Sequence, residues 1–171
     1  MAAQDSFHAY VSGRLAALSR LAYLLCGDRH TAEDLVRVTL IKVARHWERV
    51  SAGGDPDPYV RRVMVSRHVS LWRRRWRLVQ LTERPPERPV PDAAEAVSTA
   101  LAVQAALAKL APRQRAVLVL RYFEDLTETA TAEAMRCSVS TVRSQTRDAL
   151  AALRVRAPEL ADLGEPAEVP S

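Results

Sequence analysis

Glycine, cysteine and aromatic residues are scarce in this sequence. Of its 171 residues, 5 are glycine, 2 are cysteine and 5% are aromatic. So few glycines disfavour a strand-rich fold, because such a fold depends on tight turns. The two cysteines, Cys26 and Cys137, lie far apart and form no CxxC pair. We therefore expect buried free thiols here rather than a disulfide or a metal site.

Long apolar runs and catalytic signatures are also missing. No stretch of about 18 uncharged apolar residues is present, so no segment is predicted to span a membrane. The N-terminal residues lack the basic and then apolar pattern of a signal peptide, which predicts a cytoplasmic location. The four histidines lie in separate segments, and no P-loop, GxGxxG or GxSxG pattern occurs. We therefore predict no enzyme activity, no catalytic residue, no metal and no cofactor.

Strong helix formers dominate what is present, chiefly alanine, leucine and arginine. Apolar residues recur at helical spacing over residues 4–25, 29–50 and 58–81, with a loop at 51–56. Asp28 and Thr31 both offer N-caps for the second segment, and Thr31 with Asp34 resembles a capping box. Further helices are expected from about residue 93, from Pro112 to Phe123, and over 127–135 and 139–156. The sequence thus predicts an all-α protein.

Prolines and charge divide the chain into two small helical domains. Residues 82–95 contain four prolines, which predict an extended, Pro-rich flexible linker and no fixed angle between the domains. Residues 1–80 carry 14 basic and 7 acidic side chains, and residues 98–157 carry 9 and 5, whereas residues 158–171 carry 4 acids and no base. Two basic modules on one chain predict a polyanionic partner. We expect domains at 5–81 and 98–156, a linker at 82–97, and an acidic disordered tail at 157–171.

The C-terminal pair of predicted helices has the spacing of a helix-turn-helix. Thr127 and Ser138 can cap the two helices, Ala132 provides the small side chain at their crossing, and Val142 can pack back onto the first. In this motif the second helix enters the DNA major groove. Its exposed face carries hydroxyls and arginines suited to phosphate and guanine contacts: Ser140, Arg143, Ser144 and Arg147. The alternative is a solvated helix in an ordinary bundle.

The segment from Pro58 to Thr82 contains seven arginines and no acid. They are Arg61, Arg62, Arg67, Arg73, Arg74, Arg75 and Arg77, with Trp72 and Trp76 between them. Like charges at this density repel along a helix, so an anionic partner is expected. Arginine binds phosphate and tryptophan can stack on an unpaired base, which predicts nucleic-acid contact. The alternatives are tryptophans that serve as core anchors and a basic helix that lies on a membrane surface.

Four segments in order carry a family resemblance. They read RLAYLLCGDRHTAEDLV (20–36), YVRRVMVSRHVSLWRRR (59–75), LAPRQRAVLVLRYFEDLTE (110–128) and CSVSTVRSQTRDALAALR (137–154). Together they resemble extracytoplasmic-function sigma factors, in particular the SigE-like actinobacterial group, over roughly residues 5–156. The resemblance implies a sigma factor that binds core RNA polymerase and directs it to promoters for transcription initiation.

The resemblance also implies roles for individual residues. Residues 7–77 resemble the sigma-2 domain, in which Asp34, Leu35 and Trp47 would dock on the β′ clamp. The third helix would engage the −10 element and open the duplex through Arg61, Arg62, Arg67, Trp72, Arg73, Arg74 and Arg75. Residues 98–156 resemble the sigma-4 domain, which sits on the β flap and would read the −35 element through Arg143, Ser144 and Arg147. The linker would thread into the core enzyme, and an anti-sigma factor is a further candidate partner.

The sequence departs from the family pattern at several of these positions. Arg37 and Val38 stand where Gln and an acid are common, and Ser66 stands where Asn is common. Arg136 replaces a frequent Gly and Asp148 a frequent Arg. If the turn needs a positive φ, Arg136 costs about 1 kcal/mol there. The rival functions are a stand-alone helix-turn-helix regulator, which binds DNA without polymerase, and a helical bundle that docks on a membrane or a protein.

Overall fold

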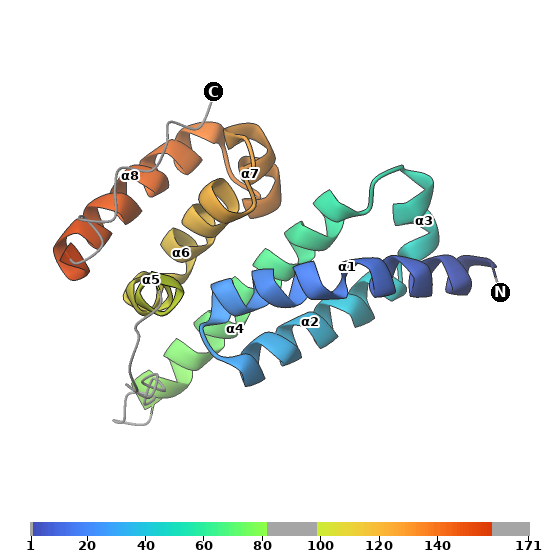
Figure 1. Cartoon of the computed structure of the whole chain (residues 1–171), viewed down its shortest axis with the longest axis horizontal. Helices are drawn as coiled ribbons and strands as arrows, with labels where there is room; N and C mark the ends of the chain where they lie inside the picture. Colours follow the sequence, from blue (N-terminus) through green and yellow to red (C-terminus); the bar gives the residue numbers. More distant parts are fainter. Residues whose placement is uncertain (1, 82–98, 159–171) are drawn as a thin grey trace.

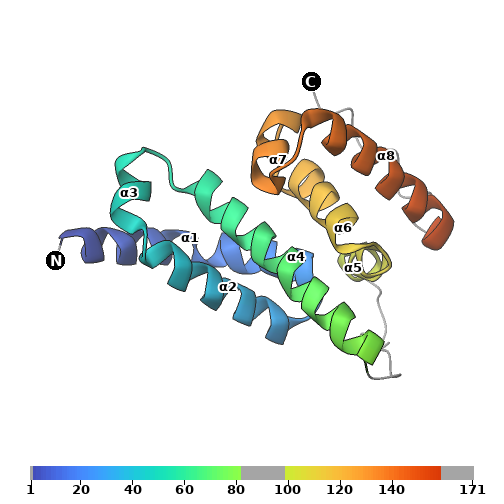
Figure 2. The ribbon, with the colours of Figure 1, turned by 180° about the vertical axis from the view of Figure 1, so that it is seen from behind.

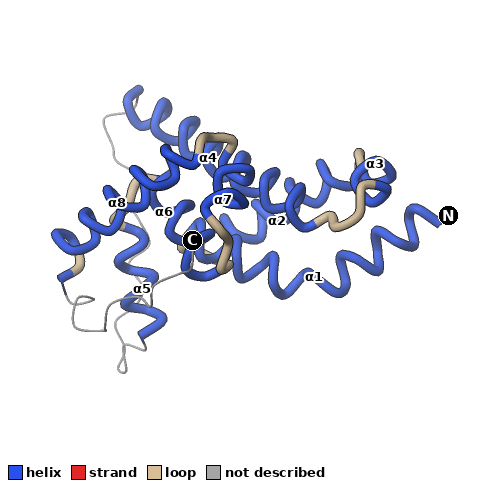
Figure 3. The backbone as a smooth tube through the Cα atoms, turned by 90° about the horizontal axis from the view of Figure 1, so that it is seen from above, coloured by secondary structure: helices blue, strands red, loops and turns tan. Residues whose placement is uncertain are grey.

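The structure is a computed structural model that describes residues 2–81 and 99–158. The N-terminal half comprises α1 (Ala2–Cys26), α2 (Arg29–Ala44), α3 (Trp47–Ala52) and α4 (Asp57–Leu81). The C-terminal half comprises α5 (Thr99–Ala108), α6 (Pro112–Leu118), the π-helical turn η1 (Val119–Phe123), α7 (Glu128–Met135) and α8 (Val139–Arg156). The described residues form only helices and loops (Figure 3), which confirms the all-α prediction. The predicted linker at 82–97, and the predicted tail beyond Pro158, lie outside the described residues.

The second helix begins at one of the two predicted caps and ends earlier than predicted. Asp28 is its N-cap, because its Oδ1 accepts a hydrogen bond from the Thr31 backbone N–H at 2.8 Å. Thr31 therefore lies inside α2, and the predicted capping box with Asp34 is wrong. The chain also breaks after Ala44, and α3 starts at Trp47. After this break, the indole of Trp47 packs against Phe7 and Tyr10 of α1.

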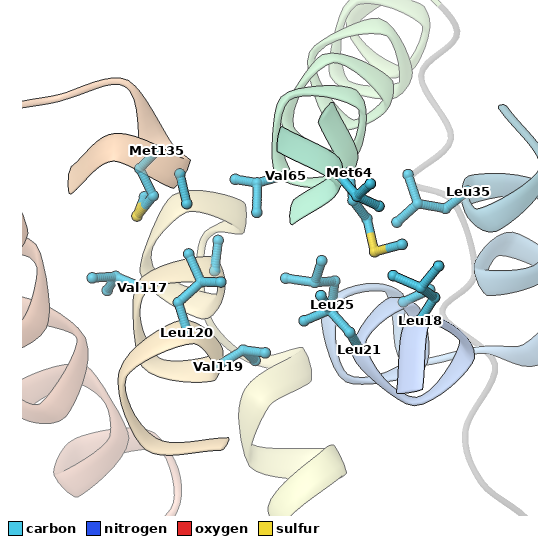
Figure 4. Packing of buried hydrophobic residues seen from close by; sticks show 14 of the residues in the cluster. Leu18, Leu21, Leu25, Leu35, Met64, Val65, Val117, Val119, Leu120 and Met135 are labelled. Atoms are coloured by element: carbon cyan, nitrogen blue, oxygen red, sulfur yellow. The ribbon is translucent and has the colours of Figure 1, made fainter. Parts of the chain in front are cut away.

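Apolar residues of both halves form one hydrophobic core. On the N-terminal side, Leu21 and Leu25 of α1 and Val65 of α4 are nearly fully buried. They face Val119 and Leu120 of the C-terminal half, as Figure 4 shows. Burial of an aliphatic side chain contributes about 1.5–3 kcal/mol, so this shared core stabilises the packed arrangement.

The two halves therefore have a defined arrangement, whereas the linker composition predicted no fixed angle. α6 and α7 pack against α4, and α6 also contacts α1. α8 packs on α6 and α7 at the outer side of the C-terminal half (Figures 1 and 2). The physical reason for the difference is the apolar surface that each half presents to the other, which a linker composition does not reveal.

A buried arginine joins the halves at the end of α1. Arg115 of α6 is only 5% exposed. Its Nε donates to the Leu24 carbonyl at 2.6 Å, and its Nη2 donates to the Gln104 side-chain oxygen at 2.8 Å. The last carbonyls of a helix lack intrahelical partners and carry partial negative charge. Arg115 thus closes the C-terminal end of α1 from the other half of the molecule.

Gly27 makes room for this guanidinium. Its φ of +85° lies in the left-handed region, and a Cβ at this position would lie 3.1 Å from Nη1 and 3.2 Å from Nη2 of Arg115. Glycine adopts positive φ without the steric penalty that a Cβ brings. Gly27 therefore follows the last residue of α1 and leaves space for Arg115 to reach the carbonyl groups at the end of this helix.

We expect Gly27→Ala to destabilise the protein by about 1–2 kcal/mol or more, because it combines a left-handed backbone with a close contact. The matched control is Gly13→Ala, also on α1, where an added Cβ would meet nothing within 4 Å. Gly13→Ala should stabilise by about 0.5–1 kcal/mol, since alanine is the better helix former. Urea unfolding of both variants tests this, and equal effects would contradict the role assigned to Gly27.

Candidate nucleic-acid interface

Both caps that the sequence predicts hold the helix-turn-helix in place. Oγ1 of Thr127 accepts from the Ala130 N–H, and Oγ of Ser138 accepts from the Thr141 N–H, each at 3.1 Å. Arg136 between them has φ 52° and ψ 51°, so the turn does need a positive φ. The structure confirms that this arginine adopts a conformation which favours glycine, at a cost of about 1 kcal/mol.

Small and branched side chains set the crossing of α7 and α8, also as predicted. Ala132 is 6% exposed and Val142 is fully buried. Arg121, just before this motif, is 8% exposed and donates to the Leu126 carbonyl. The helix-turn-helix is therefore a packed unit whose second helix keeps one face in solvent.

That solvent face carries the four residues predicted to contact the −35 element. The side chains of Arg143 and Arg147 are 67% and 77% exposed. Nε of Arg143 lies 2.7 Å from Oε2 of Glu128, and Nε of Arg147 lies 3.4 Å from Oδ1 of Asp148. Ser140 and Ser144 line the same helix, and their hydroxyls hydrogen-bond to Ser138 and to the Thr141 carbonyl. All four residues are thus brought to one helix, with both guanidiniums accessible.

The arginines of α4 fall into two groups. Arg67 and the run Arg73, Arg74 and Arg75 are exposed, as nucleic-acid contact requires. Arg61 and Arg62 are half-buried near the start of the helix, where Arg62 lies over the Tyr59 ring at 5.5 Å. Trp72 is half-buried, and the side chain of Trp76 lies outside the described part of the structure. The exposed run therefore forms a basic surface toward the C-terminal end of α4.

Arg61 faces the C-terminal half instead of open solvent. Its Nε lies 3.7 Å from Oε2 of Glu124, and its Nη2 lies 3.9 Å from Oδ2 of Asp57. Asp57 also accepts from Arg14 and, at 2.8 Å, from the Tyr10 hydroxyl. Burial raises the pKa of the Glu124 carboxyl, although nearby Arg61 and Arg20 act in the opposite direction. This charged cluster lines a cavity of about 300 Å³ between the halves.

The three residues predicted to dock on polymerase have different environments. Asp34 is half-exposed and pairs with Arg37 at 3.3 Å. Leu35 is fully buried and Trp47 is 6% exposed. Direct contact of Leu35 or Trp47 with a partner conflicts with this burial. Nε1 of Trp47 donates to Ser6 Oγ at 2.8 Å, so this tryptophan holds α3 against α1.

The half-buried Cys26 contacts the buried His68 beside Arg115. Cys26 Sγ lies 3.9 Å from Nδ1 of His68, which is 1% exposed. Burial raises the pKa of the Cys26 thiol to about 12, and burial together with the Arg115 charge lowers the pKa of His68 to about 4. Both groups are therefore neutral at physiological pH. Both cysteines are free, as expected, but they are half-buried, whereas we expected buried thiols. No cluster of three or more potential metal ligands occurs among the described residues.

Sequence reasoning missed the residues that join helices over long separations, namely Gln104, Arg115, Glu124 and Glu128. Arg115 and Arg121 did carry a signal, because each flanks the apolar run 116–120 in a predicted buried helix. A charge in such a place is retained when a specific partner satisfies it.

Comparisons with known proteins agree with this geometry. Residues 11–78 match the family description Sigma-70 region 2, and residues 100–153 match Sigma-70, region 4. The chain is 38% identical to the RNA polymerase sigma-E factor of Streptomyces coelicolor over 148 residues, which are 86% of this chain and 84% of that protein. It is 31% identical over 153 residues to the ECF RNA polymerase sigma factor SigL of Mycobacterium tuberculosis, with 85% of each chain covered.

Two solved structures share the fold. One is the sigma factor RpoE in complex with the anti-sigma factor NepR from Bartonella quintana, with a TM-score of 0.74 and 22% identity over 94% of this chain and 99% of that one. The other is CnrH in complex with the cytosolic domain of CnrY, with a TM-score of 0.59 and 21% identity over 95% and 91%. These similarities extend over both halves of the chain.

The fold and its basic helices define a DNA-binding transcription factor built from two helical halves. The chain belongs to the extracytoplasmic-function group of RNA polymerase sigma factors, the class that directs core polymerase to promoters for transcription initiation. This confirms the family and the function predicted from the sequence. None of the helices in the described part of the chain combines the length and apolar composition that a bilayer crossing requires.

The buried His68 predicts how stability depends on pH. Its pKa is lowered from 6.5 to about 4 in the folded protein, so the unfolded chain binds this proton first as the pH falls. The neutral form is therefore favourable above pH 6.5, and up to about 3 kcal/mol of stability is lost between pH 6.5 and pH 4. His68→Gln should remove this part of the pH dependence, whereas His8→Gln on the exposed surface of α1 should retain it. Urea unfolding over this pH range measures both, and parallel curves for His68→Gln and wild type would contradict the assignment.

Proposed function

We propose that the two halves of this sigma factor read two promoter elements. α8 reads the −35 element through Ser140, Arg143, Ser144 and Arg147. α4 engages the −10 element and assists strand opening through Arg61, Arg62, Arg67, Trp72, Arg73, Arg74 and Arg75. The observation that carries the proposal is the exposed arginine face of α8, held by a capped helix-turn-helix within a region that matches Sigma-70, region 4. Residues 5–81 form the sigma-2-like unit, 82–97 the linker, 98–156 the sigma-4-like unit and 157–171 the acidic tail.

We place the contact with the β′ subunit on the exposed face of α2. Asp34 lies at its edge, and Val38 and Ile41 follow along the helix with 38% and 49% exposure. Large apolar side chains exposed close together are typical of a protein contact. Leu35 and Trp47 support this surface from inside the core. The sigma-4-like unit is assigned to the β flap, as in the family.

We infer that the halves separate during promoter binding, because Arg61 is paired with the other half and cannot reach DNA while this contact is made. Glu124 of the C-terminal half forms an ion pair with Arg61, and α7 packs against the adjoining part of α4. Arg61 becomes available to DNA when these contacts open. Arg67 and the run from Arg73 to Arg75 are exposed before any opening.

The remaining assignments follow from the family. The chain supplies sequence recognition and has no enzymatic activity or cofactor of its own, and it acts in the cytoplasm with RNA polymerase. One of the similar structures is a sigma factor in complex with an anti-sigma factor. We therefore include an anti-sigma factor among the partners, beside core polymerase and promoter DNA.

Transcription with purified components tests the function against the stand-alone regulator. We expect the chain to co-purify with core polymerase and to start transcripts from promoter fragments selected by the holoenzyme. Specific gel shifts should require core polymerase, because each half alone contacts only part of the promoter. Specific DNA binding without polymerase, combined with no transcript when polymerase is added, would support the regulator and contradict the proposal.

The exposed arginines of α4 are expected to contribute phosphate contacts. Replacing Arg73, Arg74 and Arg75 with Ala should lower the slope of log K against log[salt] by up to about 0.9 per lost duplex contact, or about 0.7 for single strands. Helix content should not fall, since alanine is the better helix former.

The control triple replaces Arg29, Arg49 and Arg154 with Ala, which removes the same charge from exposed positions of α2, α3 and α8 outside the proposed polymerase and DNA contacts. Both triples are measured as assembled holoenzyme on the same promoter. An equal salt slope for wild type and the α4 triple would show that these arginines only face solvent.

A further inference from the structure

An acid on the first helix of the helix-turn-helix holds an arginine of the second. Oε2 of Glu128 lies 2.7 Å from Nε of Arg143, although the two residues are 15 positions apart. Glu128 lies in the first turn of α7, directly after the Thr127 cap, and its side chain is 27% exposed. An acid in this turn is also favoured by the helix dipole. Glu128 is therefore the fixed partner of the pair, and Arg143 is the exposed one.

This contact occupies one particular edge of the guanidinium. Arginine presents five N–H donors in one plane, one on Nε and four on the two terminal nitrogens. The bond from Nε to Glu128 leaves the terminal nitrogens for another ligand. Guanine offers O6 and N7 in the major groove, and arginine binds this pair bidentately. The pair therefore orients Arg143 for base recognition and reduces the rotamer freedom that it would lose on binding.

Arg143 differs in this respect from the other residues of the proposed −35 surface. Arg147 pairs with its own neighbour Asp148, and both side chains are more than half exposed. The hydroxyls of Ser140 and Ser144 bond within α8 or its cap. Among these four residues, only Arg143 is tied to a different helix by a charged partner, so its direction is set by the packing of α7 against α8.

The negative charge of Glu128 also lowers the affinity for DNA. Glu128 adds negative charge beside a surface that faces phosphates, which weakens sequence-independent attraction. Loss of this charge should therefore leave non-specific affinity unchanged or raise it. A purely structural role for Glu128 would have the opposite sign, because a loosened helix-turn-helix weakens binding to every DNA.

We propose that Glu128 is a positioning residue that sets specificity at the base pair read by Arg143. The proposal rests on the proposed function of α8 in reading the −35 element. Glu128 acts through Arg143 and touches no base itself. It raises discrimination between promoters by directing one guanidinium, and it lowers affinity for unrelated DNA by its charge.

The test compares Glu128→Gln with Glu133→Gln and Arg143→Ala in the assembled holoenzyme. Glu133 is an exposed acid on the same helix and makes no ion pair with Arg143, so its variant matches the change in charge. Affinities are measured for a selected −35 sequence, for the same sequence altered at the base pair that Arg143 contacts, and for unrelated DNA. Glu128→Gln should reduce discrimination about threefold to tenfold, a part of the full value of a bidentate contact. Its affinity for unrelated DNA should be equal to or higher than that of wild type.

The outcomes separate this proposal from the function on which it rests. If Arg143→Ala abolishes discrimination while Glu128→Gln retains it, α8 still reads the base and the role of Glu128 is overturned. If Arg143→Ala retains discrimination, Arg143 reads no base and both assignments to it fail. If Glu128→Gln and Glu133→Gln lose the same amount of discrimination, the effect comes from charge alone and the positioning role of Glu128 is overturned. The double variant of Glu128→Gln and Arg143→Ala should discriminate no worse than Arg143→Ala, because the acid acts only through the arginine.

Discussion

The guanidinium of Arg115, which belongs to the C-terminal half, closes the last turn of a helix in the N-terminal half. A buried charge is tolerated only where hydrogen bonds satisfy it, and each hydrogen bond to a charged group contributes about 1.5–3 kcal/mol. Here the Leu24 carbonyl and the Gln104 side chain accept from it. The contact also requires Gly27, whose missing Cβ leaves space for the terminal nitrogens. Together with the shared hydrophobic core, this side chain fixes the relative placement of the halves, and its charge adds to the burial that keeps His68 neutral.

This arrangement exposes the two helices that we propose to read DNA to different extents. α8 lies at the outer side of the C-terminal half, and both of its proposed base-reading arginines are exposed. The beginning of α4 lies against α7, where Glu124 holds Arg61. The proposed −35 surface is thus exposed while the halves are packed together, whereas part of the proposed −10 surface is occupied by the protein itself. Under the proposed function, the pairing of Arg61 with Glu124 keeps this part of α4 from DNA until the halves separate.

Local features of the fold could be predicted from the sequence, and contacts between distant residues could not. Thr127 and Ser138 cap the helices as their residue types require, and the turn demands positive φ at Arg136. These features depend on neighbours within a few positions. Trp47 was assigned to a docking surface, but its burial depends on Ser6 and Phe7, about 40 positions away. Arg115 and Glu128 form polar contacts 91 and 15 positions away, and hydrophobic periodicity carries no information about such partners. The proposed −35 residues lie on one exposed helix because one amphipathic pattern places them there.

Small-angle X-ray scattering of the free protein tests most directly whether Arg115 holds the halves together. Arg115→Met keeps a long side chain and removes the charge, and Arg113→Met makes the same change two positions earlier on α6. Wild type and Arg113→Met should show one compact size that corresponds to packed halves. Arg115→Met should show a larger and broader distribution of sizes, with helix content preserved by circular dichroism. A wild type already as expanded and as broad as Arg115→Met would contradict the account.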